Sequence, residues 1–470
     1  MAESKKLHVA VFPWLAFGHL MPLFELGKLI AQKGHKISFI STTRNIRRLP
    51  QLPPNLTPLV ELVSLSLPRE DNLPQEAEAT MDVAPHLVPY LKRAFDGLQE
   101  SLTQFLEASK PDWIIYDFAP YWLPPIASRL GISRAFFNIL SSWSICFFGH
   151  GVRDEYEART KPEHFIVPPK WIPFPSNLAF RLYDAKKMFS QLEQTVELSG
   201  CSDLFRVSSC MSGCEVFAMR SCLEVEAEWI HLYQAWHHQQ PVVPLGVLPP
   251  SVEDNNGSEK DDSYLYISDW LNKQEKGSVV YIALGSEATL GQEDLTELAL
   301  GLELSGLPFF WILRKQGNSD NPDSVELPDR FQERTEGRGI VWTSWAPQLR
   351  ILRHDSVGGF LTHCGWSSII EGLAFGRALI MLPIHVVDQG LNSRILEEKK
   401  AGKEITRNEE DGSFTRDSVA ETLRLVMVDE NGRIYREGAK EMMKIFGDRG
   451  IQDRYFSNFV GFLHDHRFGR

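Results

Sequence analysis

Two residues in the first quarter of the chain have the chemistry of a general base and its partner. His19 follows the apolar run from Leu7 to Phe12, and Asp117 directly follows the run DWIIY at 112–116. Both runs are typical of buried strands, and the carboxyl ends of parallel strands share one edge of a sheet, so the two side chains can meet there. A carboxylate beside an imidazole fixes its tautomer and stabilises the imidazolium. Position alone also allows His19 to lie in a turn and Asp117 to cap a helix.

A second block, residues 345–389, combines side chains suited to a nucleotide diphosphate. Its segment THCGWSS at 362–368 reads as a strand end leading into a helix, where hydroxyls, an imidazole and the helix dipole can hold a diphosphate. Glu371 lies one turn into that helix, where a carboxylate can accept two ribose hydroxyls. Trp345 offers a flat face for a base, and Gln348 an amide that both donates and accepts. Alone, the triplet HCG would also fit a zinc or cysteine fragment, but the whole block favours the diphosphate.

Several familiar ligand-binding motifs are absent from the sequence. It contains no G-x-G-x-x-G, no G-x-x-x-x-G-K-[ST], no G-x-S-x-G and no D-x-D pair. These absences exclude a standard dinucleotide fingerprint, a P-loop, a nucleophile elbow and an aspartate pair that holds a divalent ion against a diphosphate. We therefore expect the ligand to be bound without a metal or an organic cofactor.

The composition limits the partners and the compartment. The 470 residues include 49 basic and 61 acidic side chains, a net charge of −12, which argues against nucleic acid or an anionic membrane as the main partner. The sequence contains no run of 18 apolar residues, so we expect no integral membrane association. Because MAESKK leads directly into a strand-like stretch, we also expect no secretion. The six cysteines form no CxxC, and we expect them to be reduced in a cytoplasmic protein. They are Cys146, Cys201, Cys210, Cys214, Cys222 and Cys364.

The order of the predicted elements indicates an α/β fold with two doubly wound domains. A strand, a turn at 17–22 and a helix at 23–33 open the chain, and strands and helices then alternate as parallel sheets require. Alternation restarts after the polar, acidic stretch SVEDNNGSEKDDS. We therefore predict a linker at 248–262 between domains at 1–247 and 263–449. Two such domains make a cleft, and ligands bind beyond the carboxyl ends of the strands.

The block at 345–389 resembles the signature of the plant family-1, UDP-sugar-dependent glycosyltransferases, and the resemblance extends over essentially the whole chain. FGHLMP matches that family's catalytic-histidine turn, Asp117 its partner aspartate, and ALGSE its phosphate-binding turn. PWLAFGH, STTRNIRRLP, DWIIYD, PVVPLGVLPP and ALGLELSGLPFFW look like the subgroup that adds a second sugar to an existing glycoside. That subgroup includes glucosyl- and rhamnosyltransferases of terpenoid and flavonoid glycosides.

The resemblance implies a role for each matching residue. His19 would be the catalytic base and Asp117 its partner. Trp345 would stack on uracil, the Ala346 backbone and Gln348 would hydrogen-bond the uridine, and Glu371 would hold the ribose. The residues around the diphosphate would be Ser286, His363, Gly365, Ser367 and Ser368, and those along the sugar would be Trp366, Asp388 and Gln389.

The resemblance also implies the architecture and the reaction. Two Rossmann-like domains would face each other in the GT-B manner, with a final helix at 450–470 packing back on the N-terminal domain. The reaction would be an inverting direct displacement from a UDP-sugar, a co-substrate, by a hydroxyl of a small-molecule glycoside. We expect a monomer that needs no metal.

Three positions depart from the family pattern. Ser367 stands where the wider family usually has Asn, and Arg377 with Ala378 replaces a pair that usually ends in proline. The block has 45 residues rather than 44, because Ile384–Val387 separates Pro383 from Asp388.

The donor and the acceptor stay open at this point. We favour glucose as the sugar; the alternatives are rhamnose on the same acceptor class, or glucose transfer to an aglycone. Two other classes of protein, a nucleotide-sugar epimerase or dehydrogenase and a non-catalytic glycoside binder, are disfavoured by the missing glycine fingerprint and by the paired His19 and Asp117. Phe17, Trp122 and Trp143 can line an acceptor pocket or belong to the core.

Overall fold

The chain divides into two compact units. The computed structural model describes residues 6–149, 159–237, 240–250, 262–285, 290–313, 326–384 and 387–467. The first unit comprises Met1–Ser142, Ser190–Pro250 and Arg449–Arg470, and the second comprises Trp143–Phe189 and Ser251–Asp448.

The first unit is built on a parallel sheet with the strand order β3-β2-β1-β4-β5-β6-β7. Its strands are β1 (His8–Phe12), β2 (Lys36–Thr42), β3 (Val60–Leu65), β4 (Trp113–Tyr116), β5 (Ser133–Asn138), β6 (Val216–Met219) and β7 (Val242–Pro244). Its helices are α1 (Phe17–Gln32), α2 (Thr43–Arg48), α3 (Val88–Asp96), α4 (Gln99–Ser109), α5 (Leu123–Arg129), α9 (Asp203–Ser212), α10 (Leu223–Trp236) and α19 (Arg449–Asp465).

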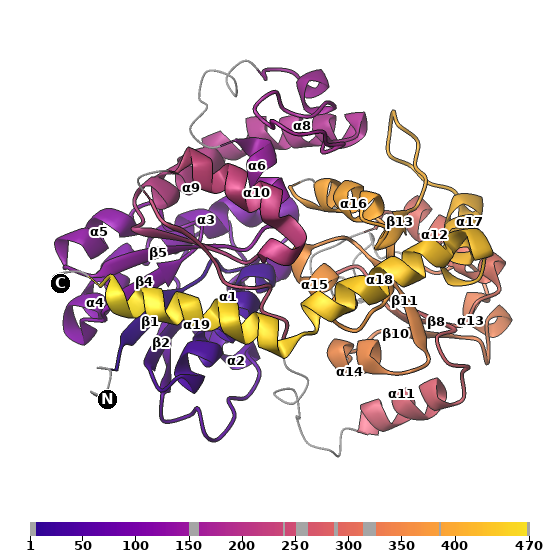
Figure 1. Cartoon of the computed structure of the whole chain (residues 1–470), viewed down its shortest axis with the longest axis horizontal. Helices are drawn as coiled ribbons and strands as arrows, with labels where there is room; N and C mark the ends of the chain where they lie inside the picture. The colour runs from indigo at the N-terminus through magenta and orange to yellow at the C-terminus, as the bar shows by residue number, and fades with distance from the viewer. Residues whose placement is uncertain are drawn as a thin grey trace. The chain divides into compact units, whose positions relative to one another are not determined.

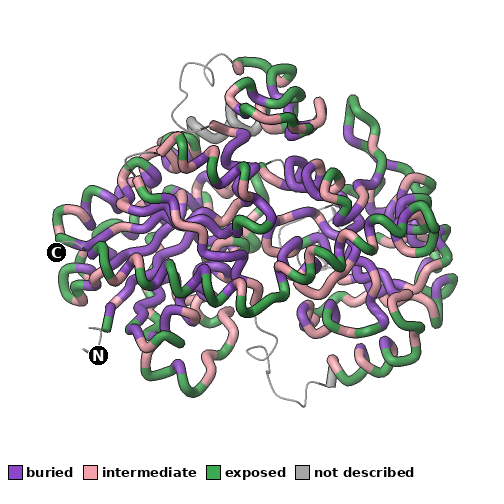
Figure 2. The backbone as a smooth tube through the Cα atoms, viewed as in Figure 1, coloured by how far each residue is buried: buried purple, intermediate pink, exposed green. Residues whose placement is uncertain are grey.

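Alternation along β1 sends side chains into both faces of this sheet. Val9 and Val11 join a core with α1 and with Phe459 of α19, which lie together on one face (Figure 1). Phe12 stacks on Phe95 of α3 at 5.0 Å between ring centroids, in the core of the other face. Helices therefore cover both faces, and the inner strands are buried almost throughout, whereas the edge strand β3 has a single buried residue, Val60 (Figure 2).

The second unit has a parallel sheet with the strand order β10-β9-β8-β11-β12-β13. Its strands are β8 (Val279–Ala283), β9 (Phe309–Ile312), β10 (Gly339–Trp342), β11 (Val357–Thr362), β12 (Ala378–Met381) and β13 (Gly402–Glu404). Its helices are α11 (Asp262–Asn272), α12 (Gln292–Ser305), α13 (Phe331–Arg334), α14 (Gln348–Arg353), α15 (Trp366–Ala374), α16 (Gln389–Glu398), α17 (Arg416–Met427) and α18 (Arg433–Phe446); α6 (Ser142–Phe148) and α8 (Leu182–Ser199) span the chain boundaries between the units.

The division differs from the expected one in the segment 143–189, which we placed in the first domain and which groups with the second unit. Side-chain contacts explain the grouping: Trp143 Nε1 donates to Asn392 Oδ1 at 2.8 Å, and Arg181 Nε donates to Glu404 Oε1 at 2.7 Å. The helix α19 belongs to the first unit, where the Trp113 indole donates to its Leu463 carbonyl at 2.8 Å.

The expected turn at 17–22 is wrong, because these residues form the beginning of α1, and Pro22 lies inside that helix. Proline lacks an N–H, and Pro22 is the sixth residue of α1, so the helix loses one internal hydrogen bond there. His19 therefore projects from the first turn of a helix. Among the described residues, none of the helices has both the length and the apolar character to cross a membrane.

Candidate functional site

His19 and Asp117 meet beside the central strands of the first unit. β1 and β4 pair in parallel with Phe12 opposite Tyr116, so both strands end at the same level of the sheet edge. In this strand order the direction of winding reverses between β1 and β4, which is where open α/β sheets bind ligands. His19 Nδ1 lies 2.8 Å from Asp117 Oδ2. The meeting expected from the strand ends is confirmed.

Backbone amides orient the carboxylate of Asp117. Trp14 N–H donates to Oδ2 at 2.8 Å, and Ala119 N–H donates to Oδ1 at 3.3 Å. The side chain of Asp117 is 2% exposed and that of His19 is 17% exposed. With Nδ1 donating to the carboxylate, Nε2 is the ring nitrogen that can accept a proton.

The same place in the second unit has a different composition. β8 and β11 end with Ala283 opposite Thr362, and Gly285 and His363 follow. A Cβ on Gly285 would lie 2.8 Å from His363 Nε2, and one on Gly365 would lie 2.6 Å from the same atom. The imidazole is therefore packed between two glycine backbones, next to the amino end of α15. Cys364, which lies between His363 and Gly365 in the sequence, has a φ of 69°, a left-handed conformation that costs energy in residues other than glycine.

A chain of hydrogen bonds connects the two residues expected to hold the nucleoside. Gln348 Nε2 donates to Glu371 Oε2 at 2.5 Å, and Tyr281 O–H donates to Gln348 Oε1 at 3.1 Å. Trp345 is 64% exposed, so its indole face is open to a stacking partner. Trp345, Gln348 and Glu371 of the expected uridine site thus come from the β10–α14 connection, from α14 and from α15.

Asp388 and Gln389 lie at the start of α16. Asn392 Nδ2 donates to Asp388 Oδ2 at 2.9 Å and to the Cys364 carbonyl at 2.9 Å. The Asn392 side chain therefore connects the turn expected to hold the diphosphate to the carboxylate expected to bind the sugar. Gln389 Oε1 accepts from Ile384 N–H at 2.9 Å, which connects the first residue of α16 to the residue after Pro383.

The structure places the remaining expected residues as follows. Ser286 lies outside the described residues, as do His385 and Val386 of the segment that carries the one extra residue. Ser367 and Ser368 lie in the first turn of α15, and Ala346 lies two residues before α14. Trp366, Trp122 and Trp143 are buried core side chains at 3%, 7% and 0% exposure.

The comparisons with known proteins establish the family. The sequence model described as UDP-glucoronosyl and UDP-glucosyl transferase matches residues 206–462. UDP-glycosyltransferase 91D1 of Stevia rebaudiana is 51% identical over 464 residues, which cover 98% of this chain and 93% of that protein. The chain belongs to the UDP-glycosyltransferase family. The soyasaponin III rhamnosyltransferase of Glycine max is 43% identical over 473 residues, covering 99% of this chain and 97% of that protein.

A solved structure with a similar fold is the UGT2 of Phytolacca americana complexed with UDP-2fluoro-glucose and pterostilbene. It has a TM-score of 0.74 at 23% identity and covers 98% of this chain and 100% of its own. The expected fold class, two Rossmann-like domains of the GT-B type, is confirmed, as is the assignment of the protein as a UDP-glycosyltransferase.

In this UDP-glycosyltransferase, the presence of Arg377, one of the departures from the family pattern, has a structural explanation. Its Nε donates to the Leu352 carbonyl at 2.6 Å, and its Nη1 donates to the Val357 carbonyl. The guanidinium therefore satisfies carbonyls at the carboxyl end of α14 and at the start of β11. Burial lowers the pKa of Arg377 to about 10.

Sequence reasoning missed the residues that hold the site together. Tyr281 and Asn392 hydrogen-bond the expected ligand-binding side chains, but neither stands out by type or spacing. The only available signal was position, since Tyr281 lies in the strand before ALGSE and Asn392 lies one turn after Asp388. Within the described ranges, no group of three His, Cys, Asp or Glu side chains could hold a metal ion; metal-independent catalysis stays a prediction.

Proposed function

We propose that this UDP-glycosyltransferase catalyses an inverting direct displacement with His19 as the general base. The observation that supports this role most strongly is the 2.8 Å contact between His19 Nδ1 and Asp117 Oδ2 beside β1 and β4. Nε2 removes the proton from an acceptor hydroxyl, the oxygen attacks the anomeric carbon, and UDP leaves from the opposite face. A positioned base of this kind contributes about 10²- to 10⁴-fold in rate.

The second unit would bind the donor. Trp345 stacks on uracil, the Ala346 backbone and Gln348 hydrogen-bond the uridine, and Glu371 accepts the ribose hydroxyls. The diphosphate lies against the amino end of α15, where Ser367 and Ser368 supply hydroxyls and the helix dipole favours negative charge. His363, Gly365 and Ser286 complete that site, and Trp366, Asp388 and Gln389 line the sugar.

Glucose is the donor we favour, with a hydroxyl of a terpenoid or flavonoid glycoside as the acceptor. The resemblance of the sequence to sugar-on-sugar transferases supports this acceptor class. Rhamnose is the alternative donor, because the relative that is 43% identical is named as a rhamnosyltransferase of soyasaponin III. Glucose transfer to an aglycone is the third possibility.

The enzyme would work as a monomer, without a cofactor, in the cytoplasm. All six cysteines are free in the structure, which is the usual state in a reducing compartment.

A product assay tests the proposed function. The purified chain is incubated with UDP-glucose or UDP-rhamnose and a panel of glycosides and matching aglycones, and products are identified by mass spectrometry and NMR. We expect a new glycosidic bond of inverted configuration, formed faster on a glycoside than on its aglycone. Retention of configuration, or UDP binding without transfer to any member of the panel, would contradict the proposal.

Metal independence is tested by adding excess chelator to the same assay. The rate should stay intact, because amides, hydroxyls and His363 replace the ion at the diphosphate. A large loss that Mg²⁺ or Mn²⁺ restores would reveal a metal site.

A further inference from the structure

The loop that follows β4 is held from one side by α9. This loop, residues 117–122, begins with Asp117. The Cys210 thiol donates to the Phe118 carbonyl at 3.3 Å, and Arg206 Nη1 donates to the Ala119 carbonyl at 3.2 Å. Burial raises the pKa of the Cys210 thiol well above its usual range, so the thiol keeps the proton that it donates. Two successive carbonyls of the loop are therefore fixed by one helix.

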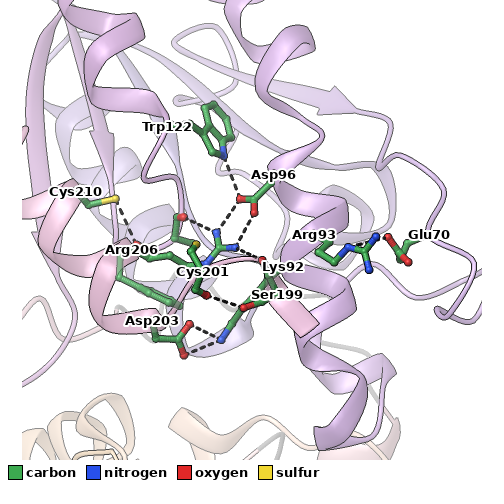
Figure 3. A network of polar contacts seen from close by, with 12 residues as sticks. Glu70, Lys92, Arg93, Asp96, Trp122, Ser199, Cys201, Asp203, Arg206 and Cys210 are labelled. Carbon is green, nitrogen blue, oxygen red and sulfur yellow. Dashed lines mark hydrogen bonds and ion pairs between the residues drawn. The ribbon is translucent and has the colours of Figure 1, made fainter. Parts of the chain in front are cut away.

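Arg206 is held in place by Asp96 at the end of α3. Its Nη1 and Nη2 donate to the two carboxylate oxygens of Asp96 at 2.7 and 2.6 Å, a bidentate pair (Figure 3). The guanidinium side chain is 0% exposed. Burial alone lowers the pKa of Arg206, but the hydrogen bonds to Asp96 leave it above its ordinary value. Trp122, at the other end of the loop, donates from Nε1 to Asp96 Oδ1 at 3.2 Å. The pair thus holds the loop at Ala119, in its middle, and at Trp122, its last residue.

A short path of hydrogen bonds leads from this pair to His19. Arg206 fixes the carbonyl of Ala119, whose N–H donates to Asp117 Oδ1 at 3.3 Å. The other oxygen of Asp117 lies 2.8 Å from His19 Nδ1. A shift of the loop therefore moves the carboxylate that orients the imidazole.

We propose that Arg206, fixed by Asp96, is a positioning residue that holds Asp117 in the geometry that orients His19. This inference rests on the proposed function, in which His19 is the base. Arg206 acts through the loop 117–122 and touches neither donor nor acceptor in this role.

A second ion pair between the same two helices offers a matched control. Lys92 of α3 donates from Nζ to the carboxylate oxygens of Asp203 of α9 at 2.5 and 2.7 Å. Lys92 is 5% exposed, and Figure 3 shows its pair beside the Arg206–Asp96 pair. The hydrogen bonds of Lys92 go to Asp203 and not to the loop 117–122. Loss of this pair disturbs the packing of α3 on α9 without releasing the loop directly.

The experiment compares Arg206→Met with Lys92→Met in the full-length enzyme. For Arg206→Met we expect kcat to fall at least tenfold, with the KM for the UDP-sugar and the Kd for UDP within twofold of wild type. Amide hydrogen exchange should become faster in a peptide that spans 117–122. Lys92→Met should keep kcat within threefold and leave that peptide protected, at a comparable loss of thermal stability.

A double-mutant cycle separates positioning from general damage. If Arg206 acts through Asp117, Arg206→Met in an Asp117→Ala background should cost less than threefold in kcat, since the group to be positioned is already gone. Full additivity of the two losses would overturn the inference, as would unchanged exchange at 117–122 in Arg206→Met.

Two further variants keep the outcome interpretable. If Arg206→Met does not fold, Asp96→Asn with Arg206→Met removes both charges and preserves an acceptor for the Trp122 indole, and the same results are expected. His19→Ala tests the underlying function: activity within tenfold of wild type there would overturn the role of the base. If His19→Ala leaves activity unchanged and the kcat losses of Arg206→Met and Asp117→Ala are additive, the positioning role of Arg206 is overturned as well.

Discussion

Counted within each unit, the two sheets share the strand order 3-2-1-4-5-6, to which the first unit adds β7. The residues proposed as functional follow the same two strands in each unit, but with different chemistry. After β1 and β4 the first unit carries a histidine and an aspartate, bonded side chain to side chain at 2.8 Å. After β8 and β11 the second unit carries Gly285, His363 and Gly365, where the missing Cβ atoms make room for an imidazole. A shared topology therefore fixes where a site forms, and local residues decide what the site does.

The difference matches the roles proposed for the two sites. The proposed base requires a carboxylate at a fixed angle, and in the first unit Asp117 accepts hydrogen bonds from two backbone amides, while its loop accepts one from the ion-paired Arg206. The proposed diphosphate site requires amides and hydroxyls at a helix amino end, and the second unit has tight turns and small residues there. Damage to the first site should lower the rate of chemistry, and damage to the second should lower donor affinity.

The largest expected effect is on the base. His19→Ala should lower kcat by about 10²- to 10⁴-fold, since that is the range a positioned general base contributes. Asp117→Ala should cost less, because the partner orients the base and does not replace it. Steady-state kinetics with a saturating donor measure both. An Asp117→Ala loss larger than that of His19→Ala would reverse the assigned roles.

The next effect concerns the glycine that makes room for His363. Gly285→Ala should weaken UDP binding about tenfold or more, because the new Cβ would lie 2.8 Å from the imidazole and φ is +90°. Gly277, at the other end of β8, is the control: its φ is +69°, and a Cβ added there would have no neighbouring atom within 4 Å. Gly277→Ala carries a similar backbone strain and should leave the Kd for UDP unchanged. Equal Kd changes in both variants would show that the packing against His363 is unimportant.

A third effect concerns the carboxylate before α16. If Asp388 binds the sugar, Asp388→Ala should lower kcat/KM by roughly 10- to 150-fold with the preferred donor, the range for a hydrogen bond to a charged group. Glu398→Ala, a change at the far end of α16, is the control.

Deleting Val387, which is 58% exposed, should change donor preference more than stability. If both the Asp388 and the Val387 variants keep the wild-type kcat/KM with UDP-glucose and with UDP-rhamnose, Asp388 does not bind the sugar.

The last effect concerns the stability of the second unit and not its activity. Burial raises the pKa of Asp184, which is 7% exposed, to about 6. A raised carboxyl pKa stabilises the folded state below the unfolded value near 4, and that contribution is lost as the pH rises through 6. Asp184→Asn should therefore increase the free energy of unfolding at pH 7.5 by up to about 3 kcal/mol, which thermal melts would show as a higher midpoint. The gain should disappear near pH 4. Asp269→Asn, whose side chain is 68% exposed, should show no such pH-dependent gain.

The sequence predicts well where neighbouring residues decide the outcome. The strand-like runs at 7–12 and 112–116 form β1 and β4 to within one residue, and the meeting of His19 and Asp117 that these strand ends allow is present in the structure. The extra residue lies by sequence between Pro383 and Asp388, beyond β12, and β12 keeps an unbroken register with β11 and β13 up to Met381.

The sequence fails where contacts between distant residues decide. Trp143 and Asn392 are 249 positions apart, and their hydrogen bond helps to group 143–189 with the second unit. Arg206 has the pattern of an exposed charge on an amphipathic helix, yet Asp96, 110 positions away, makes its burial possible. Neither pairing leaves a local pattern, because each residue is compatible with a surface position until the fold brings its partner close.

The division of labour between the two units is tested most directly by calorimetric titration of UDP into His19→Ala and Glu371→Ala. Glu371 is bonded to Gln348 at 2.5 Å in the second unit, and His19 belongs to the first. We predict a Kd for UDP within twofold of wild type in His19→Ala and weakened at least tenfold in Glu371→Ala. An equal loss of UDP affinity in both variants would contradict the assignment of chemistry to the first unit and donor binding to the second.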